Sequence, residues 1–187
     1  MERYAEQHGV PVSRPETIRF IETLLRSANA GTVLEIGTAI GYSAIAMARC
    51  GAAVTTVERD ADLLRIAREN VTKYGFDGRV TVIGGDAGEV LKRLDGEFDF
   101  IFLDAAKAQY REFFPHCMRL LKRGGVLLSD NVLYKGMVAT DELAVRRKIT
   151  IIKRLRRYLD ELCAAEELVT SIIPIGDGCA LSYKIGL

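Results

Sequence analysis

Short apolar runs and amphipathic stretches alternate along most of the chain. Five runs are rich in apolar and β-branched residues and predict buried strands, at residues 32–36, 54–58, 80–84, 98–104 and 125–130. Between them, apolar residues recur at helical spacing near residues 42–49, 60–74, 87–94 and 107–121. Regular alternation of strand and helix predicts a parallel sheet with helices on both faces. Right-handed crossovers make such a sheet doubly wound.

The two ends of the chain add further elements. A helix is predicted to begin near Ser13, which can cap it, with Pro15 in its first turn and Glu16 placed for a capping box. A second, long helix is predicted at about residues 141–162. The last two strands are joined by Gly-Asp-Gly, and so short a link requires antiparallel pairing. They are predicted at residues 167–175 and 179–185.

We therefore expect one α/β domain over residues 1–187, which is long enough to bury a sizeable core. An N-terminal helical segment at 1–30 would precede a Rossmann-like core at 31–187. The sheet of that core would have seven strands, mostly parallel, with an antiparallel C-terminal edge strand.

Composition narrows the class of protein without naming an activity. Hydrophobic residues make up 49% of the chain and charged residues 27%, as in ordinary globular proteins, and the net charge of +1 gives no global basic field. No apolar stretch approaches the roughly 20 residues of a membrane helix, and the charged N-terminus lacks a signal core, so we expect a cytoplasmic protein without a membrane partner. The scattered cysteines are expected to be reduced packing residues, and two histidines are too few for a His-based zinc site.

The turn after the first predicted strand is the usual ligand cradle of a doubly wound sheet. It reads EIGTAIG from Glu35 to Gly41, without the GxGxxG spacing of a dinucleotide site. Gly37 permits a sharp turn, and Gly41 permits close approach of the backbone. Glu35 would repel a pyrophosphate but can hold an ammonium group. The turn therefore favours a small cationic ligand.

Two further strand ends extend this site. Glu58 ends the second predicted strand and can accept both hydroxyls of a ribose. Asp86 and Ala87 follow the third strand, near where a base would lie. An ammonium site, a ribose site and a base site together describe S-adenosylmethionine. The alternative is that Glu35 and Glu58 are merely solvated strand ends.

The sequence resembles the metal-dependent O-methyltransferases of the caffeoyl-CoA and catechol type, which have the class I methyltransferase fold. The resemblance extends from about Glu2 to Lys184. The turn motif ExGxxxGYS marks class I methyltransferases in general, whereas the Asp-x-x-Lys and Asp-Asn pairs are more specific. The motifs are ExGxxxGYS, VERD, GDA, LDAAKAQY, GGVLLSDNVL and PIGDG.

The resemblance implies a role for each matching residue. Asp104 and Lys107 match the catalytic positions, with Lys107 as the catalytic lysine. The divalent metal ligands would be Asp104, Asp130 and Asn131. The contacts to S-adenosylmethionine would be Ser13, Glu35, Gly37, Thr38, Ser43, Glu58, Ala87 and Asp104. Ala106 stands where the family often has a second acid.

Chemistry supports the metal assignment independently. Asp104 closes the fourth predicted strand, and Asp130 and Asn131 close the fifth. Neighbouring parallel strands lie about 4.8 Å apart, so their ends can share one cation. Two carboxylates and an amide oxygen suit Mg²⁺, Mn²⁺ or Ca²⁺. Such an ion lowers the pKa of a bound hydroxyl, and Lys107 can point into the same site as a base. The alternative for Asp130 and Asn131 is a polar strand end that caps a loop.

The resemblance leaves two classes of acceptor open: small catechol-like or caffeoyl-CoA-like molecules, and 5-hydroxyuridine in tRNA. Both present an acidic hydroxyl beside a second oxygen. We expect the tRNA acceptor because the polar face of the predicted long helix is strongly basic, although such a face can also be merely solvated. The resemblance further implies a homodimer. The apolar positions of the predicted long helix, which are expected to face the core, are Val145, Ile149, Ile152, Leu155 and Leu159. The cations of its polar face are Arg146, Arg147, Lys148, Lys153, Arg154, Arg156 and Arg157.

Two other functions fit a fold of this kind. A nicotinamide-dependent oxidoreductase is disfavoured by the missing GxGxxG spacing. A catalytically silent protein that binds S-adenosylmethionine or RNA is disfavoured because Asp104, Lys107, Asp130 and Asn131 are all present.

Overall fold

The computed structural model describes residues 1–186. Within them, seven strands follow the order β3-β2-β1-β4-β5-β7-β6, which confirms the predicted mixed sheet with an antiparallel C-terminal edge. The chain forms two compact units, Met1–Asp95 and a second one that begins at Gly96. The strands are β1 (Thr32–Ile36), β2 (Ala53–Glu58), β3 (Val80–Gly84), β4 (Phe98–Leu103), β5 (Leu121–Ser129), β6 (Leu168–Ile173) and β7 (Cys179–Lys184).

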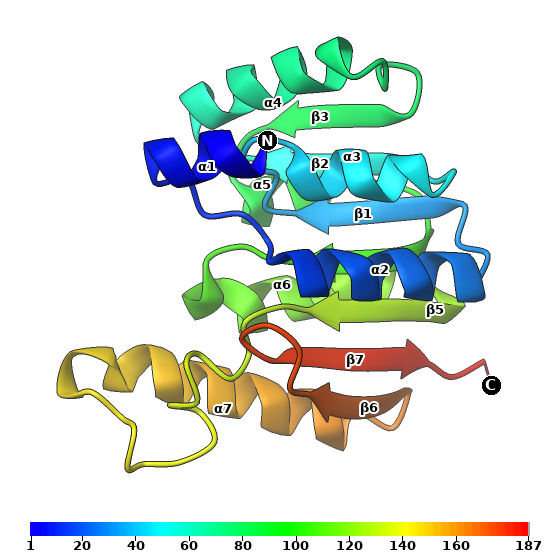
Figure 1. The fold of residues 1–187 in the computed structure, drawn as a ribbon. Helices are drawn as coiled ribbons and strands as arrows, with labels where there is room; N and C mark the ends of the chain where they lie inside the picture. Colours follow the sequence, from blue (N-terminus) through cyan, green and yellow to red (C-terminus); the bar gives the residue numbers. More distant parts are fainter. Residues whose placement is uncertain (187) are drawn as a thin grey trace. The chain divides into compact units, whose positions relative to one another are not determined.

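The first unit is built around three parallel strands. β1 pairs with β2 from Thr32↔Ala53 onwards, and β2 pairs with β3 up to Glu58↔Gly84, so the carboxyl ends of all three lie at one edge. Helices α3 and α4 pack against β2 and β3, and α2 packs against α3 (Figure 1). The helices are α1 (Glu2–His8), α2 (Pro15–Ser27), α3 (Tyr42–Arg49), α4 (Ala61–Lys73) and α5 (Ala87–Arg93).

The predicted start of α2 is partly wrong. Pro15 does occupy the first turn, but Arg14 is the N-cap residue and no side chain caps the helix. Arg14 is extended, with φ −66° and ψ 151°. A residue before proline is driven out of the helical region by the proline ring, so the helix cannot begin earlier and Ser13 lies one residue too far away to cap it.

The second unit contains the mixed part of the sheet. β4 and β5 are parallel, and β7 runs antiparallel between β5 and β6. Helix α6 packs against β4 and β5, and α7 packs against α6 and β6 (Figure 1). The helical elements are η1 (Lys107–Gln109), α6 (Tyr110–Leu120), η2 (Arg146–Lys148) and α7 (Ile149–Ala164).

The predicted long helix begins later than the sequence pattern indicated. α7 starts at Ile149, and Val145 before it is extended. Val145 and Ile149 are 47% and 40% exposed, so the expectation that they face the core is wrong, and Leu159 is half-buried. The buried residues of α7 are Ile152, Leu155, Tyr158 and Leu162, which recur at helical spacing.

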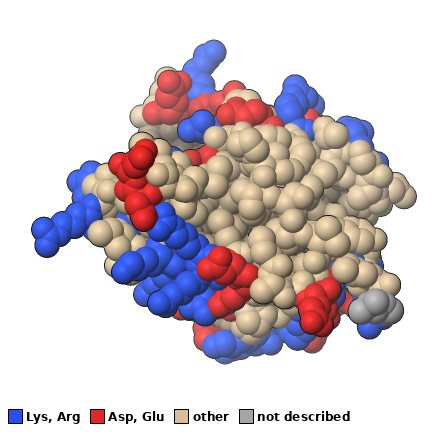
Figure 2. Space-filling model, turned by 90° about the horizontal axis from the view of Figure 1, so that it is seen from below, with Lys and Arg blue, Asp and Glu red and all other residues tan. Residues whose placement is uncertain are grey.

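Most cations of this segment are exposed. Figure 2 shows Lys and Arg side chains gathered on the side of the second unit where α7 lies. Arg156 is an exception because its guanidinium is half-buried, pairs with Asp141 at 2.7 Å and donates to the Val138 carbonyl at 3.0 Å. The exposed cations are Arg146, Arg147, Lys153, Arg154 and Arg157.

Candidate functional site

The turn that leaves β1 is compact and has an unusual backbone. Gly37, Ala39 and Gly41 have φ values of 106°, 48° and 82°. The Gly41 amide donates to the Thr38 carbonyl at 2.9 Å and the turn leads directly into α3. A left-handed alanine carries a cost that glycine avoids, and such costs are typical of functional sites. The predicted turn is therefore present at the carboxyl end of β1, and its role as a ligand cradle stays a prediction.

Glu35 is fully buried at the base of this turn. Its carboxylate accepts hydrogen bonds from the hydroxyl of Ser43 on α3 and from the hydroxyl of Thr56 on β2, the latter at 2.5 Å. The Thr38 hydroxyl lies 2.5 Å from the Thr56 hydroxyl. The structure thus brings Glu35, Thr38 and Ser43 together through Thr56, which the sequence did not single out. What could have indicated Thr56 in the sequence is that it is a polar residue within a predicted buried strand.

Glu58 is held in one orientation by backbone amides. One carboxylate oxygen accepts from Ala39 of the turn and the other from Asp60, both at 2.9 Å. Only 9% of the residue is exposed. Because Glu35 and Glu58 are both buried and hydrogen-bonded, the alternative that they are solvated strand ends is wrong.

The other predicted residues of the first unit lie in ordinary structural positions. Asp86 is the N-cap of α5 and accepts from the Glu89 amide at 3.3 Å, and Ala87 is the first residue of that helix. Ser13 is buried in the segment between α1 and α2. Capping alone accounts for the Asp86 carboxylate in this structure.

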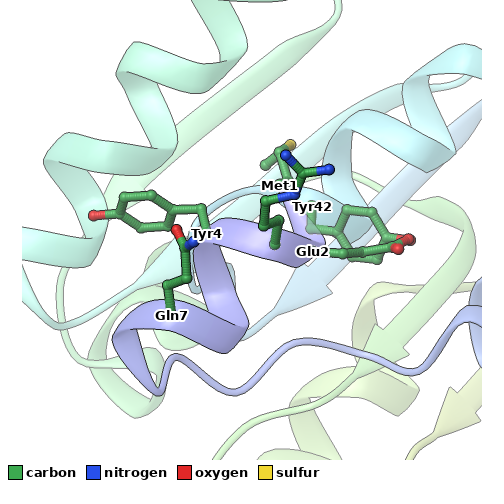
Figure 3. Close-up of a pocket in the computed structure, with 6 residues that line it drawn as sticks. Met1, Glu2, Tyr4, Gln7 and Tyr42 are labelled. Atoms are coloured by element: carbon green, nitrogen blue, oxygen red, sulfur yellow. The ribbon is translucent and has the colours of Figure 1, made fainter.

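An open pocket of about 540 Å³ lies between α1 and the start of α3 (Figure 3). Tyr42, which directly follows Gly41, donates its hydroxyl to the Glu2 carboxylate. Burial, and then the hydrogen bond to Glu2, raise the pKa of Tyr42 to about 12. The phenol is therefore a donor at neutral pH. The lining residues are Met1, Glu2, Arg3, Tyr4, Gln7 and Tyr42.

In the second unit, the acidic residues follow two paired strand ends. Leu103 is in register with Ser129, so Asp104 and Asp130 come one residue beyond the last paired residues of β4 and β5. Asp130 is 1% exposed and Asn131, next to it, is half-buried with a left-handed φ of 54°. The structure therefore brings all three predicted metal ligands to one edge of this part of the sheet.

The surroundings of Asp130 disfavour the ionised form of its carboxyl group. Burial, followed by the charge of Asp104, raises the pKa of Asp130 to about 6. Its Oδ1 accepts from the Asn131 amide at 2.6 Å and from the Cys179 thiol at 3.5 Å. Cys179 was predicted only as a packing residue, and no spacing pattern in the sequence indicates this contact.

Lys107 lies beside the same acids. Its Nζ is 3.7 Å from Oδ1 of Asp104, and the two side chains are 23% and 20% exposed. Ala106 is exposed and precedes η1. Among the described residues, no three His, Cys, Asp or Glu side chains are grouped so that they could hold a metal ion, so a metal centre here depends on the Asn131 amide. The donor set fits a hard divalent cation, whose charge would relieve the repulsion between the two carboxylates.

Comparison with known proteins shows the family of this chain. Residues 4–185 match the family described as O-methyltransferase. The catechol O-methyltransferase of Niastella koreensis is 30% identical over 90% of this chain and 80% of its own length. A candidate caffeoyl-CoA O-methyltransferase from Staphylococcus aureus has a structure that matches with a TM-score of 0.92 and 36% identity, over 98% of this chain and 90% of that one. The Bacillus cereus O-methyltransferase, solved in complex with SAH, matches with a TM-score of 0.87 and 27% identity, over 97% and 87% of the two chains.

The fold is that of the class I methyltransferases. Within that class, the chain belongs to the O-methyltransferase family of the caffeoyl-CoA and catechol type. The prediction of an S-adenosylmethionine-dependent O-methyltransferase is thereby confirmed at the level of the family. The tRNA acceptor, the divalent metal, the homodimer, the single-domain description and the individual residue roles stay predictions. No helix among residues 1–186 is long and apolar enough to cross a bilayer.

Proposed function

We propose that this chain transfers the methyl group of S-adenosylmethionine to an acidic hydroxyl of a small acceptor that carries a second oxygen beside the first, as catechols do. The observation that carries this proposal is the pair of acids beyond the paired ends of β4 and β5, one of which, Asp130, is almost fully buried. The named relatives support the acceptor class because one is a catechol O-methyltransferase and another a candidate caffeoyl-CoA O-methyltransferase.

The first unit would hold the methyl donor. Glu35 would face the ammonium group of S-adenosylmethionine, with Ser43 and Thr56 fixing its carboxylate. Glu58, oriented by two amides, would accept hydrogen bonds from the ribose hydroxyls. SAH in the Bacillus cereus relative supports this choice of donor. The remaining proposed contacts are Ser13, Gly37, Thr38, Asp86, Ala87 and Asp104.

The second unit would hold a divalent cation through Asp104, Asp130 and Asn131, with Mg²⁺, Mn²⁺ or Ca²⁺ suited to these oxygen donors. When bound, such an ion lowers the pKa of a catechol hydroxyl that coordinates it. Lys107, whose Nζ lies 3.7 Å from Oδ1 of Asp104, would take the proton from that hydroxyl. The acceptor oxygen then forms a bond to the methyl carbon as the carbon–sulfur bond breaks, leaving SAH and an ether.

A second candidate acceptor is 5-hydroxyuridine in tRNA. The exposed cations of η2 and α7 favour it because phosphate contacts need lysine and arginine on one face (Figure 2). Arg156 is engaged by Asp141 and the Val138 carbonyl, which removes it from the set that sequence alone assigned to the basic face. No relative compared above is described as acting on tRNA, so the small acceptor is the better supported reading.

The test offers labelled S-adenosylmethionine together with a catechol panel or with tRNA containing 5-hydroxyuridine, each with and without EDTA. We expect label on the small acceptor and its loss in EDTA. Label on the tRNA alone would replace the first candidate by the second. Reversing Arg146, Arg147 and Arg157 to Glu should then abolish tRNA labelling, whereas labelling of a catechol should be unchanged. Full labelling in EDTA would contradict the metal centre for either acceptor.

A further inference from the structure

Tyr110, the first residue of α6, is fully buried beside the proposed metal ligands. Its hydroxyl lies 3.0 Å from the Asp130 carbonyl and 3.2 Å from the Leu103 carbonyl. Burial, and then the charges of Asp104 and Asp130, raise the pKa of Tyr110 well above its ordinary value. The phenol has one proton to donate and two carbonyl acceptors within hydrogen-bond distance.

These carbonyls belong to the peptide bonds that carry the proposed ligands. The Leu103 carbonyl is part of the Leu103–Asp104 peptide, and the Asp130 carbonyl is part of the Asp130–Asn131 peptide. One hydroxyl thus contacts the backbone beside Asp104, Asp130 and Asn131 together. The paired ladder of β4 and β5 ends at Leu103↔Ser129, so the ligands lie just beyond it. The Asp130 amide, which donates to the Leu103 carbonyl at 3.0 Å, makes the other contact between the two strand ends.

Tyr158 of α7 offers a contrast within the same cluster. It is also fully buried, and its ring meets that of Tyr110 edge to face at 5.4 Å between centroids. Its hydroxyl, however, lies 2.6 Å from the side chain of Ser129, a residue still within the paired ladder. Tyr158 therefore stabilises the packing of α7 on β5 without touching the peptides of the proposed ligands.

We propose that Tyr110 is a positioning residue that sets the spacing of Asp104 and Asp130, and so the affinity of their centre for a divalent cation. The inference rests on the metal centre of the proposed function. A hydroxyl behind the ligands acts as outer partners of metal ligands do, by holding the donors where the ion requires them. Removing it leaves the strand ends joined by the Asp130 amide alone among these contacts, and the carboxylates gain freedom.

The experiment compares Tyr110→Phe with the matched variant Tyr158→Phe, each of which removes one buried hydroxyl and keeps its ring. Binding of Mn²⁺ is followed by electron paramagnetic resonance without donor or acceptor, so that no activity is needed. We expect the Mn²⁺ dissociation constant to rise about tenfold in Tyr110→Phe. In Tyr158→Phe it should stay within about twofold, although both melting temperatures should fall by roughly 5 °C.

Equal Mn²⁺ affinity in Tyr110→Phe and the unchanged chain would overturn the inference, and so would equal weakening in both tyrosine variants. Asp104→Asn and Asp130→Asn separate this failure from that of the proposed function. If those two variants bind Mn²⁺ as the unchanged chain does, or if the unchanged chain binds none, the metal centre itself is wrong and the inference falls with it. Should Tyr110→Phe be poorly folded, the comparison is repeated in about 1 M trimethylamine N-oxide, which favours the folded state.

Discussion

The buried acids of the two units have different surroundings. In the first, Glu35 receives hydrogen bonds from two hydroxyls and Glu58 from two amides, so each carboxylate is held in place by donors. In the second, Asp130 is equally buried but faces the like charge of Asp104, and its pKa is raised to about 6. The first arrangement is complete without a metal ion. In the second, protonation of Asp130 or the proposed cation would relieve the repulsion between the two acids.

The largest expected effect follows from removing an acid of the second unit. Asp130→Ala should lower methyl transfer by about a hundredfold to a thousandfold because a proposed metal ligand is lost. Its dissociation constant for S-adenosylmethionine, measured by calorimetry, should change by less than about twofold. Asp99→Ala is the control, since Asp99 lies near the start of β4 and pairs with Lys122 at 2.7 Å. Full turnover by Asp130→Ala would remove the metal role assigned to this residue.

Stability should respond with opposite signs in the two units. The raised pKa of Asp130 means that its protonated form is favoured by folding. This contribution is complete below pH about 4 and is lost as the pH rises through about 6. At pH 7 and without metal, Asp130→Asn should therefore raise the free energy of unfolding by up to about 3 kcal/mol. Glu35→Gln should lower it by about 1–3 kcal/mol because an amide replaces an oxygen that accepts from a hydroxyl.

Urea denaturation of metal-free protein at pH 4 and pH 7 measures both changes. The gain in Asp130→Asn should shrink toward zero at pH 4, where the native residue is already protonated. Saturating Mg²⁺ should reverse its sign at pH 7 by stabilising the unchanged chain alone. A loss of stability in metal-free Asp130→Asn at pH 7 would show that the two units do not differ in this way.

The positions of the acids at the strand ends of both units could be predicted from the sequence. β1 and β3 have the predicted bounds, and Glu35, Glu58, Asp104 and Asp130 lie at or next to strand ends as expected. An apolar run that ends in a polar residue can be recognised in the sequence alone. The parallel pairing within each unit then brings those ends to a common edge.

The partners of these acids could not be predicted in the same way. Thr56, Tyr110 and Cys179 each make a hydrogen bond to an acid that is distant in sequence, and such contacts leave no periodic signal. The start of α7 was wrong for a related reason. Val145 and Ile149 continue the apolar spacing of the helix, but η2 interrupts it before the helix begins at Ile149. The spacing of apolar residues indicates that a helix is present, but it does not give the residues at which the helix begins and ends.

The smallest expected effect comes from the hydroxyl of Thr56, which contacts Glu35 in the first unit. Thr56→Val keeps the shape of the side chain but removes the hydroxyl that donates to Glu35 and contacts Thr38. We expect the dissociation constant for S-adenosylmethionine to rise about threefold to tenfold, while Mn²⁺ binding stays unchanged. Thr55→Val is the matched control because successive strand residues point to opposite faces and Thr55 makes neither contact. If Thr56→Val weakens Mn²⁺ binding as much as donor binding, the Thr56 hydroxyl does not act on the donor site alone. Equal donor affinity in both threonine variants would show that Glu35 does not need its hydroxyl partners to hold the donor.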